Sequence, residues 1–282
     1  MSSRYLRSRR TLRGPTAWIR GIGLHSGVDV AVRVLPASTG SGIVFRNAQG
    51  QTIPADVAHV VYTERCTVLG SEDFQIQTVE HMLAALYGCV VDDAIIEVDG
   101  PELPAVDGSA FPFIEIIEHV GCKEQDLSAV EPLIIDTEFI VSNDSGGCIT
   151  VAPSDELDVS VELQYDSHSY LGTIGARMSD LGQFKLEIAS SRTFGFRTEL
   201  AWLQSKGLGL GASHDNAIVL GDDRYESALR HNNELARHKI LDIIGDISLI
   251  GRPICAKIVA LRPSHSLNNR LAIRFAETSS RS

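Results

Sequence analysis

The sequence lacks two features that would place it outside the cell or in a membrane. Its five cysteines are scattered and contain no CxxC pair: Cys66, Cys89, Cys122, Cys148 and Cys255. An odd number of scattered cysteines favours reduced thiols, and so a cytoplasmic protein, over a disulfide framework. No apolar run approaches the ~20 residues of a membrane-spanning helix. The basic residues 1–14 are not followed by the apolar segment of a secretory signal, and we interpret them as an arm leading into a first strand.

Positive charge is also scarce. The chain has 25 Lys and Arg against 36 Asp and Glu, a formal net charge of −11. This balance argues against a general binder of nucleic acid or of anionic membranes. We therefore expect no nucleic-acid partner and no stable membrane insertion. Separately from the charge, we expect a small-molecule substrate and a monomer. With 282 residues, 44% of them hydrophobic, the chain can form two domains with a substantial core.

A nucleotide-binding glycine loop is absent as well. Gly207, Gly209 and Gly211 do not have the spacing GxGxxG or GxxxxGK, and no strand–loop–helix pattern surrounds them. These glycines predict a turn or a close backbone approach instead. A second glycine-rich loop, residues 21–27, surrounds His25 and by itself is typical of a plain turn with a solvated histidine.

Hydrophobic periodicity predicts an α+β protein. Alternating or short apolar runs predict strands at residues 28–34, 43–46, 94–98, 157–165 and 254–261. Helical patterns, with Thr78 as a possible cap of the first helix, occur at residues 77–87, 113–120 and 231–246. Residues 121–132 are polar and aperiodic, so we place a domain boundary there and predict two similar α+β domains, 1–124 and 125–282.

The helix at residues 231–246 carries polar groups where a buried helix should have none. Its isoleucines and leucines cover most of its circumference, which predicts burial. His238, Asp242 and Asp246 are spaced i, i+4 and i+8, so they lie on one narrow stripe. A buried His–Asp hydrogen bond explains a lone HxxxD pair. The third acid and the neighbouring Lys239 favour a cation held by an imidazole and a carboxylate.

A second candidate ligand comes from the helix at residues 77–87. Glu80 and His81 are adjacent near its N-terminus, as in zinc hydrolases where a glutamate beside a ligand histidine acts on the attacking water. Taken alone, this pair is more typical of a surface glutamate and a core-edge histidine.

Together these segments predict a catalytic zinc site. His81, His238 and Asp242 provide two imidazoles and one carboxylate and leave a position open, as catalytic rather than structural zinc sites do. Glu80 is then the candidate general base. His265, which the sequence places in a polar, turn-like segment, is the candidate general acid, oriented by Asp246.

Six blocks of sequence, in order and spanning about residues 21 to 270, resemble one enzyme family. They are EHMLAALYG, LPAVDGSAFPF, SRTFGF, LGASHDNAIVL, RHKILDIIGD and SHSLNN. The chain is similar to UDP-3-O-acyl-N-acetylglucosamine deacetylases, the zinc amidases of lipid A biosynthesis in Gram-negative bacteria. The resemblance implies two α+β domains, each a sheet with helices on one face, with the helix layers facing each other.

The resemblance also implies roles for individual residues. It assigns zinc to His81, His238 and Asp242, the base to Glu80, the acid to His265, and support of His265 to Asp246. Four further positions match the family's motifs: Thr193 as a donor to the oxyanion, Phe194 as a substrate contact, Lys239 near the phosphates, and His25 near the substrate. The chain departs from the family pattern at Ser264, where glycine is common, and at His214, where an apolar or aromatic residue is usual.

Two other functions stay open at this stage. One is a zinc amidohydrolase of the same fold that acts on a different acylated amino sugar. The other is an inactive relative that binds the lipid precursor as a sensor. The intact set of Glu80, His81, His238, Asp242 and His265 argues against an inactive relative, because a binding protein has no need of both a base and an acid.

Overall fold

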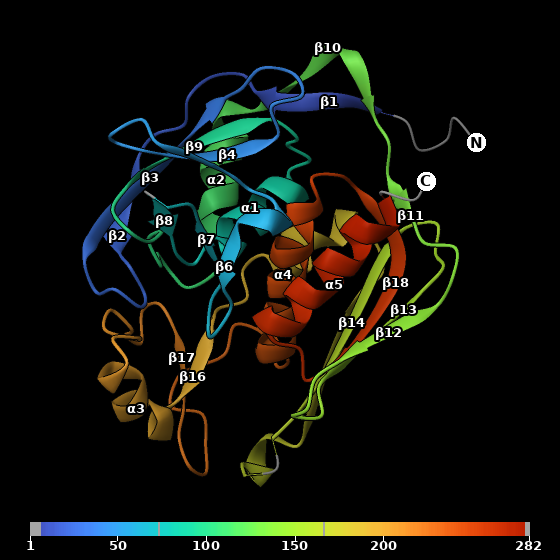
Figure 1. The fold of residues 1–282 in the computed structure, drawn as a ribbon. Coiled ribbons are helices and arrows are strands. Elements are labelled where there is room, and N and C mark those ends of the chain that lie inside the picture. The colour runs from blue at the N-terminus through green and yellow to red at the C-terminus, as the bar shows by residue number, and fades with distance from the viewer. Residues whose placement is uncertain (1–6, 73, 166, 280–282) are drawn as a thin grey trace.

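The computed structural model describes residues 7–72, 74–165 and 167–279 (Figure 1). The first six residues of the predicted N-terminal arm lie outside this part of the chain. The fold is a mixed α+β arrangement of several sheets with helices packed against them, as the periodicity predicts. All five cysteines are free thiols. None of the helices in the described residues is long and apolar enough to cross a membrane.

The first half of the chain forms a five-stranded sheet. Its strands, in spatial order, are β2 (Ile19–Ile22), β3 (Asp29–Pro36), β9 (Ala94–Asp99), β4 (Ile43–Asn47) and β5 (Thr52–Pro54). The alternating valines of β3, such as Val32 and Val34, are fully buried against the helices α1 (Glu80–Gly88) and α2 (Phe111–Val120). A small sheet of β6 (Val60–Tyr62), β7 (Val68–Gly70) and β8 (Gln75–Ile76) is inserted before α1.

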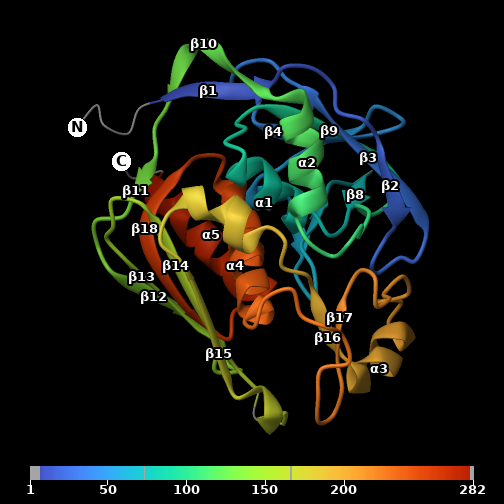
Figure 2. The same cartoon turned by 180° about the vertical axis from the view of Figure 1, so that it is seen from behind.

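The second half forms a larger sheet. Its strands, in spatial order, are β12 (Phe139–Ser142), β13 (Cys148–Ala152), β18 (Ile254–Leu261), β14 (Leu157–Gln164) and β15 (Thr173–Met178), and β11 (Leu133–Ile134) also pairs with β18. Helices α4 (Glu234–Ile247) and α5 (His265–Ser279) pack on it. The parallel strands β16 (Phe194–Phe196) and β17 (Ile218–Leu220) and the helix α3 (Leu200–Ser205) project from the body of the molecule (Figure 2).

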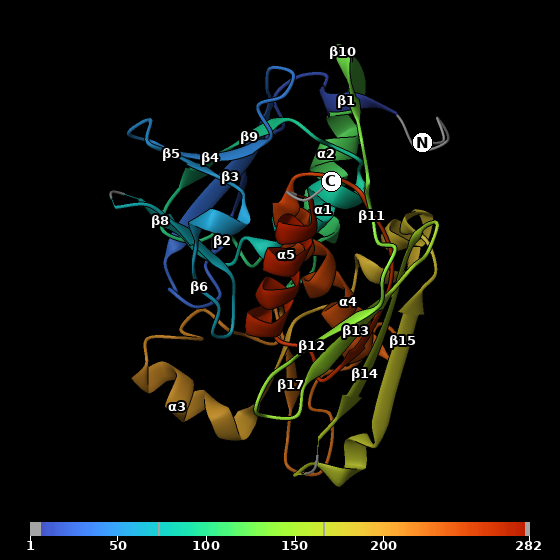
Figure 3. The same cartoon turned by 45° about the vertical axis from the view of Figure 1, so that its right-hand side comes forward.

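The helices lie between the two large sheets, with α4 and α5 beside α1 (Figure 3). Contact between α1 and α4 is unusually close at Gly245. A Cβ atom added there would lie 2.1 Å from the backbone oxygen of Glu80. Glycine therefore lets the helix that carries Asp242 approach the helix that carries His81.

Gly245→Ala should destabilise the protein because the clashing atom belongs to the backbone of α1 and cannot rotate away. We expect a loss of about 1–3 kcal/mol, the usual range for overpacking. Thermal unfolding measures it. Gly175→Ala is the control, since the nearest atom to its added Cβ would be at 3.8 Å. Equal melting temperatures for the two variants would mean that the two helices can separate without cost.

Two local predictions are wrong, and one segment has more structure than its composition indicates. Within the polar, aperiodic residues 121–132, β10 (Cys122–Val130) pairs antiparallel with β1 (Arg7–Leu12). Such pairing uses main-chain groups and does not require alternating apolar side chains. The proposed boundary at residues 124/125 falls inside β10, and the division into domains stays a prediction. Thr78 does not cap α1; its φ is +57° and its hydroxyl donates to Glu102. His265 is no solvated loop residue but the buried first residue of α5.

Candidate active site

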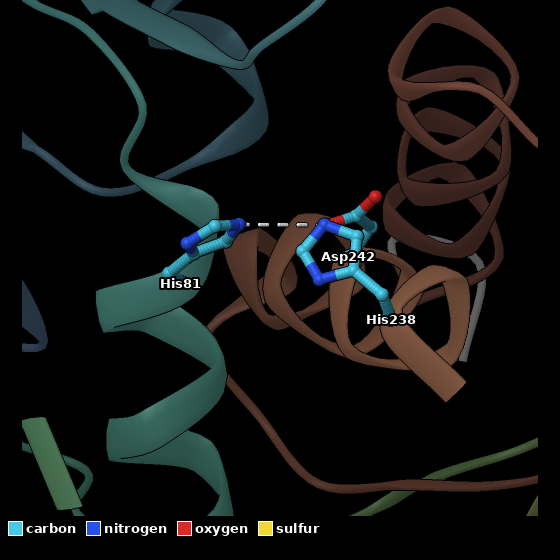
Figure 4. Close-up of side chains that lie close together, drawn as sticks. All are labelled: His81, His238 and Asp242. Atoms are coloured by element: carbon cyan, nitrogen blue, oxygen red, sulfur yellow. Dashed lines mark ion pairs between the residues drawn. The ribbon is translucent and has the colours of Figure 1, made fainter. Parts of the chain in front are cut away.

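The three predicted metal ligands meet where α1 and α4 pack together. The ligand atoms of His81, His238 and Asp242 all lie within 4.8 Å of one another. Asp242 Oδ1 lies 3.3 Å from His238 Nε2 and 3.8 Å from His81 Nε2. Figure 4 shows the two imidazoles, one from each helix, turned toward the carboxylate. All three side chains are buried.

The protonation of these groups suits a cation. His238 Nδ1 donates to the backbone oxygen of Ser191 at 3.0 Å, which leaves Nε2 as a lone pair facing the site. Burial lowers the pKa of His81 to about 3, and it also lowers the pKa of His238. Burial raises the pKa of Asp242, but the neighbouring side chains His238, Lys239, His265 and His81 lower it by more than that, so the carboxylate is ionised. Asp242 Oδ1 is buried and makes no hydrogen bond within the described residues, so the donor set fits a metal ion.

Glu80 lies beside this centre and is almost fully buried. Its Oε2 accepts a hydrogen bond from the backbone N–H of Thr67 at 3.0 Å, and its Oε1 lies 3.9 Å from His265 Nε2. Burial raises the pKa of Glu80 to about 8; His265 opposes this shift, and the acids Asp246 and Asp242 add to it. A carboxylate with a pKa near neutrality can exchange protons at working pH.

His265 is held in a fixed orientation by Asp246. Its Nδ1 donates to Asp246 Oδ2 at 2.9 Å, and Asp246 also accepts from Thr67 Oγ1 at 2.6 Å and from Asn268 Nδ2 at 2.9 Å. Burial lowers the pKa of His265, but Asp246, Glu80 and Asp242 raise it more, to about 9. The imidazole is therefore protonated near neutral pH, and its Nε2–H faces the pocket.

Ser264, the departure beside the candidate acid, has a structural explanation. Its Oγ accepts a hydrogen bond from the backbone N–H of Leu267 at 3.3 Å, as an N-cap residue of α5 does. The helix therefore begins at His265, and the serine helps to fix that beginning.

These groups line one pocket of about 780 Å³. Nine of the ten residues predicted from the sequence line it: His25, Glu80, His81, Thr193, Phe194, His238, Lys239, Asp242 and His265. The tenth, Asp246, lies behind His265. Lys239 Nζ contacts Asp242 Oδ2 at 2.7 Å and lies 5.4 Å from the centre of the Phe194 ring, so it links the metal centre to the open part of the pocket.

Sequence reasoning missed several residues of this pocket. Thr67 joins Glu80 to Asp246, yet a threonine directly before a strand carries no signal of such a role. Tyr165, His168 and Phe196 form an aromatic wall, in which His168 stacks on Phe196 with a centroid distance of 4.2 Å. Tyr165 and His168 lie in one segment of the chain and Phe196 in another, and only the fold brings the two segments together.

Two imidazoles and a carboxylate, with the buried Glu80 carboxylate and the His265 imidazole beside them in one pocket, fit a metal-dependent hydrolase. The chain belongs to the LpxC family, the UDP-3-O-acyl N-acetylglycosamine deacetylases, whose sequence profile matches residues 9–277. Membership confirms the resemblance and the predicted deacetylase activity.

Curated relatives cover nearly the whole chain. A UDP-3-O-acyl-N-acetylglucosamine deacetylase of Syntrophus aciditrophicus is 39% identical over 275 residues, which is 95% of this chain and 86% of that protein. The protein of the same name from Acidithiobacillus ferrooxidans is 38% identical over 270 residues (93% and 88%). That of Nautilia profundicola is 39% identical over 265 residues (93% and 89%).

Proposed function

We propose that the chain hydrolyses the acetamide of UDP-3-O-acyl-N-acetylglucosamine, giving acetate and the free amine of UDP-3-O-acyl-glucosamine in lipid A biosynthesis. The observation that carries this proposal is that Glu80 and His265, two residues able to transfer protons, lie 3.9 Å apart beside a buried His–His–Asp centre. Water adds its oxygen to the carbonyl carbon of the acetyl group, the amide C–N bond breaks, and the amine leaves with a proton.

Zinc is the proposed metal, held by His81, His238 and Asp242. When bound, it polarises the amide carbonyl and lowers the pKa of the attacking water to about 7. Imidazole and carboxylate ligands also suit iron, which would leave the same residues in place.

The chain's own groups move the protons. Glu80, fixed by the N–H of Thr67, takes a proton from the attacking water. His265, fixed by Asp246, gives a proton to the leaving nitrogen. Thr193 donates its hydroxyl to the developing oxyanion. Its backbone is held on both sides, by Gly108 O at 2.8 Å and by Ile218 N at 2.8 Å, so the hydroxyl starts from a fixed position.

For the rest of the substrate, we propose that Lys239 contacts the phosphates, that Phe194 packs on the substrate and that His25 lies beside it. An acidic protein that binds an acidic substrate needs local positive charge, which Lys239 supplies at the pocket wall.

Lys239→Ala should therefore raise KM by roughly 10- to 100-fold, the value of a charged hydrogen bond, and change kcat less. Lys239→Arg keeps the charge and should recover part of the loss. Lys257→Ala, an exposed lysine of β18, is the control. Because Lys239 also donates to Asp242, a fall in kcat at unchanged KM would assign it to the metal centre instead.

The substrate assay tests the whole proposal and its two alternatives. Acetate release is measured from UDP-3-O-acyl-N-acetylglucosamine, from the same sugar without UDP, and from other acylated amino sugars. We expect turnover of the first and strong loss without UDP. Preference for another amino sugar would identify a different amidohydrolase, and tight binding without turnover would identify a sensor protein.

We also propose that the fold comprises two α+β domains, residues 1–124 and 125–282, whose helix layers face each other. The close packing of α1 on α4 supports this arrangement. The protein is proposed to be a cytoplasmic monomer, which the five free cysteines support in part.

A further inference from the structure

Glu102 is a buried carboxylate that the proposed chemistry does not use. It lies in the loop after β9, its side chain is fully buried, and it accepts hydrogen bonds from three groups. The donors are His25 N at 3.0 Å, Ser26 N at 2.8 Å and Thr78 Oγ1 at 2.7 Å. A buried carboxylate with three donors holds those donors firmly in place. Glu102 therefore ties the glycine-rich loop of residues 21–27 to the segment that leads into α1.

The loop is built closely around this carboxylate. At Gly23 an added Cβ atom would meet Ser26 Oγ and Glu102 Oε2, the latter at 2.4 Å. Gly23 therefore has no room for a side chain. Close contact with Glu102, rather than the geometry of a plain turn, therefore requires a glycine at this position near His25.

The second glycine-rich loop holds the ring of His25. At Gly211 an added Cβ would lie 2.2 Å from Gly23 O, so the two loops approach backbone to backbone, as the glycines predict. The backbone N–H of Gly209 donates to His25 Nδ1 at 3.3 Å. Since Nδ1 accepts this hydrogen bond, the neutral ring must carry its own proton on Nε2.

The Nε2 atom of His25 is buried at the wall of the pocket and has no hydrogen-bond partner within the described residues. The side chain lines the pocket and is 6% exposed, and Nε2 makes no hydrogen bond within the described residues. Burial lowers the pKa of His25, so the ring is neutral near pH 7; nearby Glu102 partly opposes this shift. The backbone of Arg65 also favours the protonated ring, but its carbonyl does not reach hydrogen-bond geometry with Nε2. A buried N–H donor without an acceptor costs free energy unless a ligand satisfies it.

We propose that Glu102 is a positioning residue for substrate binding: it holds the loop of residues 21–27 so that His25 presents Nε2–H to an oxygen acceptor of the substrate. This inference rests on the proposed function and specifies how His25 recognises the substrate. A phosphate oxygen and a sugar oxygen are both acceptors of this kind. UDP carries the phosphates but not the acylated sugar. The inhibition constant of UDP, measured in wild type and in a His25 variant, therefore distinguishes a phosphate acceptor from a sugar acceptor.

Kinetics test the contact first. His25→Leu removes the donor and should raise KM roughly tenfold, with a smaller change in kcat. His25→Gln keeps an amide N–H near the position of Nε2 and should recover part of the loss. If the acceptor is a phosphate, the inhibition constant of UDP rises in parallel in His25→Leu; if it is a sugar oxygen, only KM of the full substrate rises. Equal KM and kcat values for the wild type, His25→Leu and His25→Gln would show that His25 does not contact the substrate in this way.

A double variant tests whether Glu102 acts through His25. Glu102→Gln keeps the size of the side chain but turns an amide donor toward the N–H groups of the loop. It should raise KM as His25→Leu does, and Glu102→Gln/His25→Leu should be no worse than His25→Leu alone. Additive losses, or a fall in kcat that Thr78→Val reproduces, would show that Glu102 acts through α1 instead.

The tautomer of His25 provides a readout that does not depend on turnover. Nitrogen-15 chemical shifts of labelled histidine distinguish protonated from bare ring nitrogens, and the His25→Gln spectrum assigns the signal. We expect Nε2–H with bare Nδ1 in wild type and a mixture of tautomers in Glu102→Gln. Nδ1–H in wild type would overturn the proposal. This result stands even if Glu102→Gln fails to fold or if the substrate proves to be another amino sugar.

Discussion

Replacing His238 by alanine should remove the bound metal ion and, with it, nearly all turnover. The imidazole is one of the three proposed ligands, and its loss leaves the buried carboxylate of Asp242 with His81, the Lys239 ammonium and His265 beside it. Metal content measured by elemental analysis, on protein purified without added metal, should fall from one ion per chain to almost none. Deacetylation should fall with it.

A matched control separates the loss of a ligand from the loss of a histidine. His119→Ala, at the exposed end of α2, should keep both metal and activity. Full metal retention in a His81→Ala/His238→Ala double variant would show that the ion is held elsewhere. Iron found in place of zinc would change the cofactor but leave the ligand assignment intact.

Glu80→Ala and His265→Ala should each lower kcat by roughly 10²–10⁴-fold, the usual contribution of a positioned base or acid. Both groups act in the transition state, so kcat should fall more than KM rises. Both variants should retain the metal, because neither residue belongs to the His–His–Asp set. Loss of metal in Glu80→Ala would make this residue a ligand rather than the base.

The same two residues should shape the pH–rate profile. Glu80 works only when ionised, so activity rises with pH through its pKa, which burial raises to about 8. His265 works only when protonated, so activity falls above its pKa of about 9, where the attraction of Asp246, Glu80 and Asp242 outweighs the effect of burial. A bound cation favours ionised Glu80 and neutral His265, which moves both limbs of the bell to lower pH.

Variants identify which limb belongs to which group. His265→Ala should lose or shift the alkaline limb, and Glu80→Ala should lose or shift the acid limb. An unchanged alkaline limb with near wild-type activity in His265→Ala would place the general acid on another residue. Thr67→Val offers a milder comparison, since it removes the hydroxyl donor to Asp246 while keeping the backbone N–H that binds Glu80.

Much of the site was predictable because it depends on local spacing. The i, i+4, i+8 spacing places His238, Asp242 and Asp246 on one face of any helix, whatever surrounds it. The adjacency of Glu80 and His81 likewise needs only a short helix. The order of the matched blocks then identified the family, because such a set of motifs is far more specific than any one of them.

The sequence could not determine the contacts between segments that are distant in the chain. The pairing of β1 with β10 depends on main-chain groups, which carry no side-chain pattern. The start of α5 at His265 depends on a serine cap in a segment that otherwise has the composition of a loop. Burial of His265 depends on packing against elements from both halves of the chain.

The sequence by itself determined the family and the candidates for the metal ligands, the base and the acid. Only the tertiary structure decided the partners that lie elsewhere in the chain: Thr67 for Glu80, Thr67 and Asn268 for the Asp246 carboxylate beside His265, and Glu102 for the loop of His25. The physical reason is that a hydrogen bond requires two atoms within about 3 Å. Spacing along the chain specifies such a distance only within one helix or turn. Between segments, the distance depends on how α1, α4 and the glycine-rich loops pack.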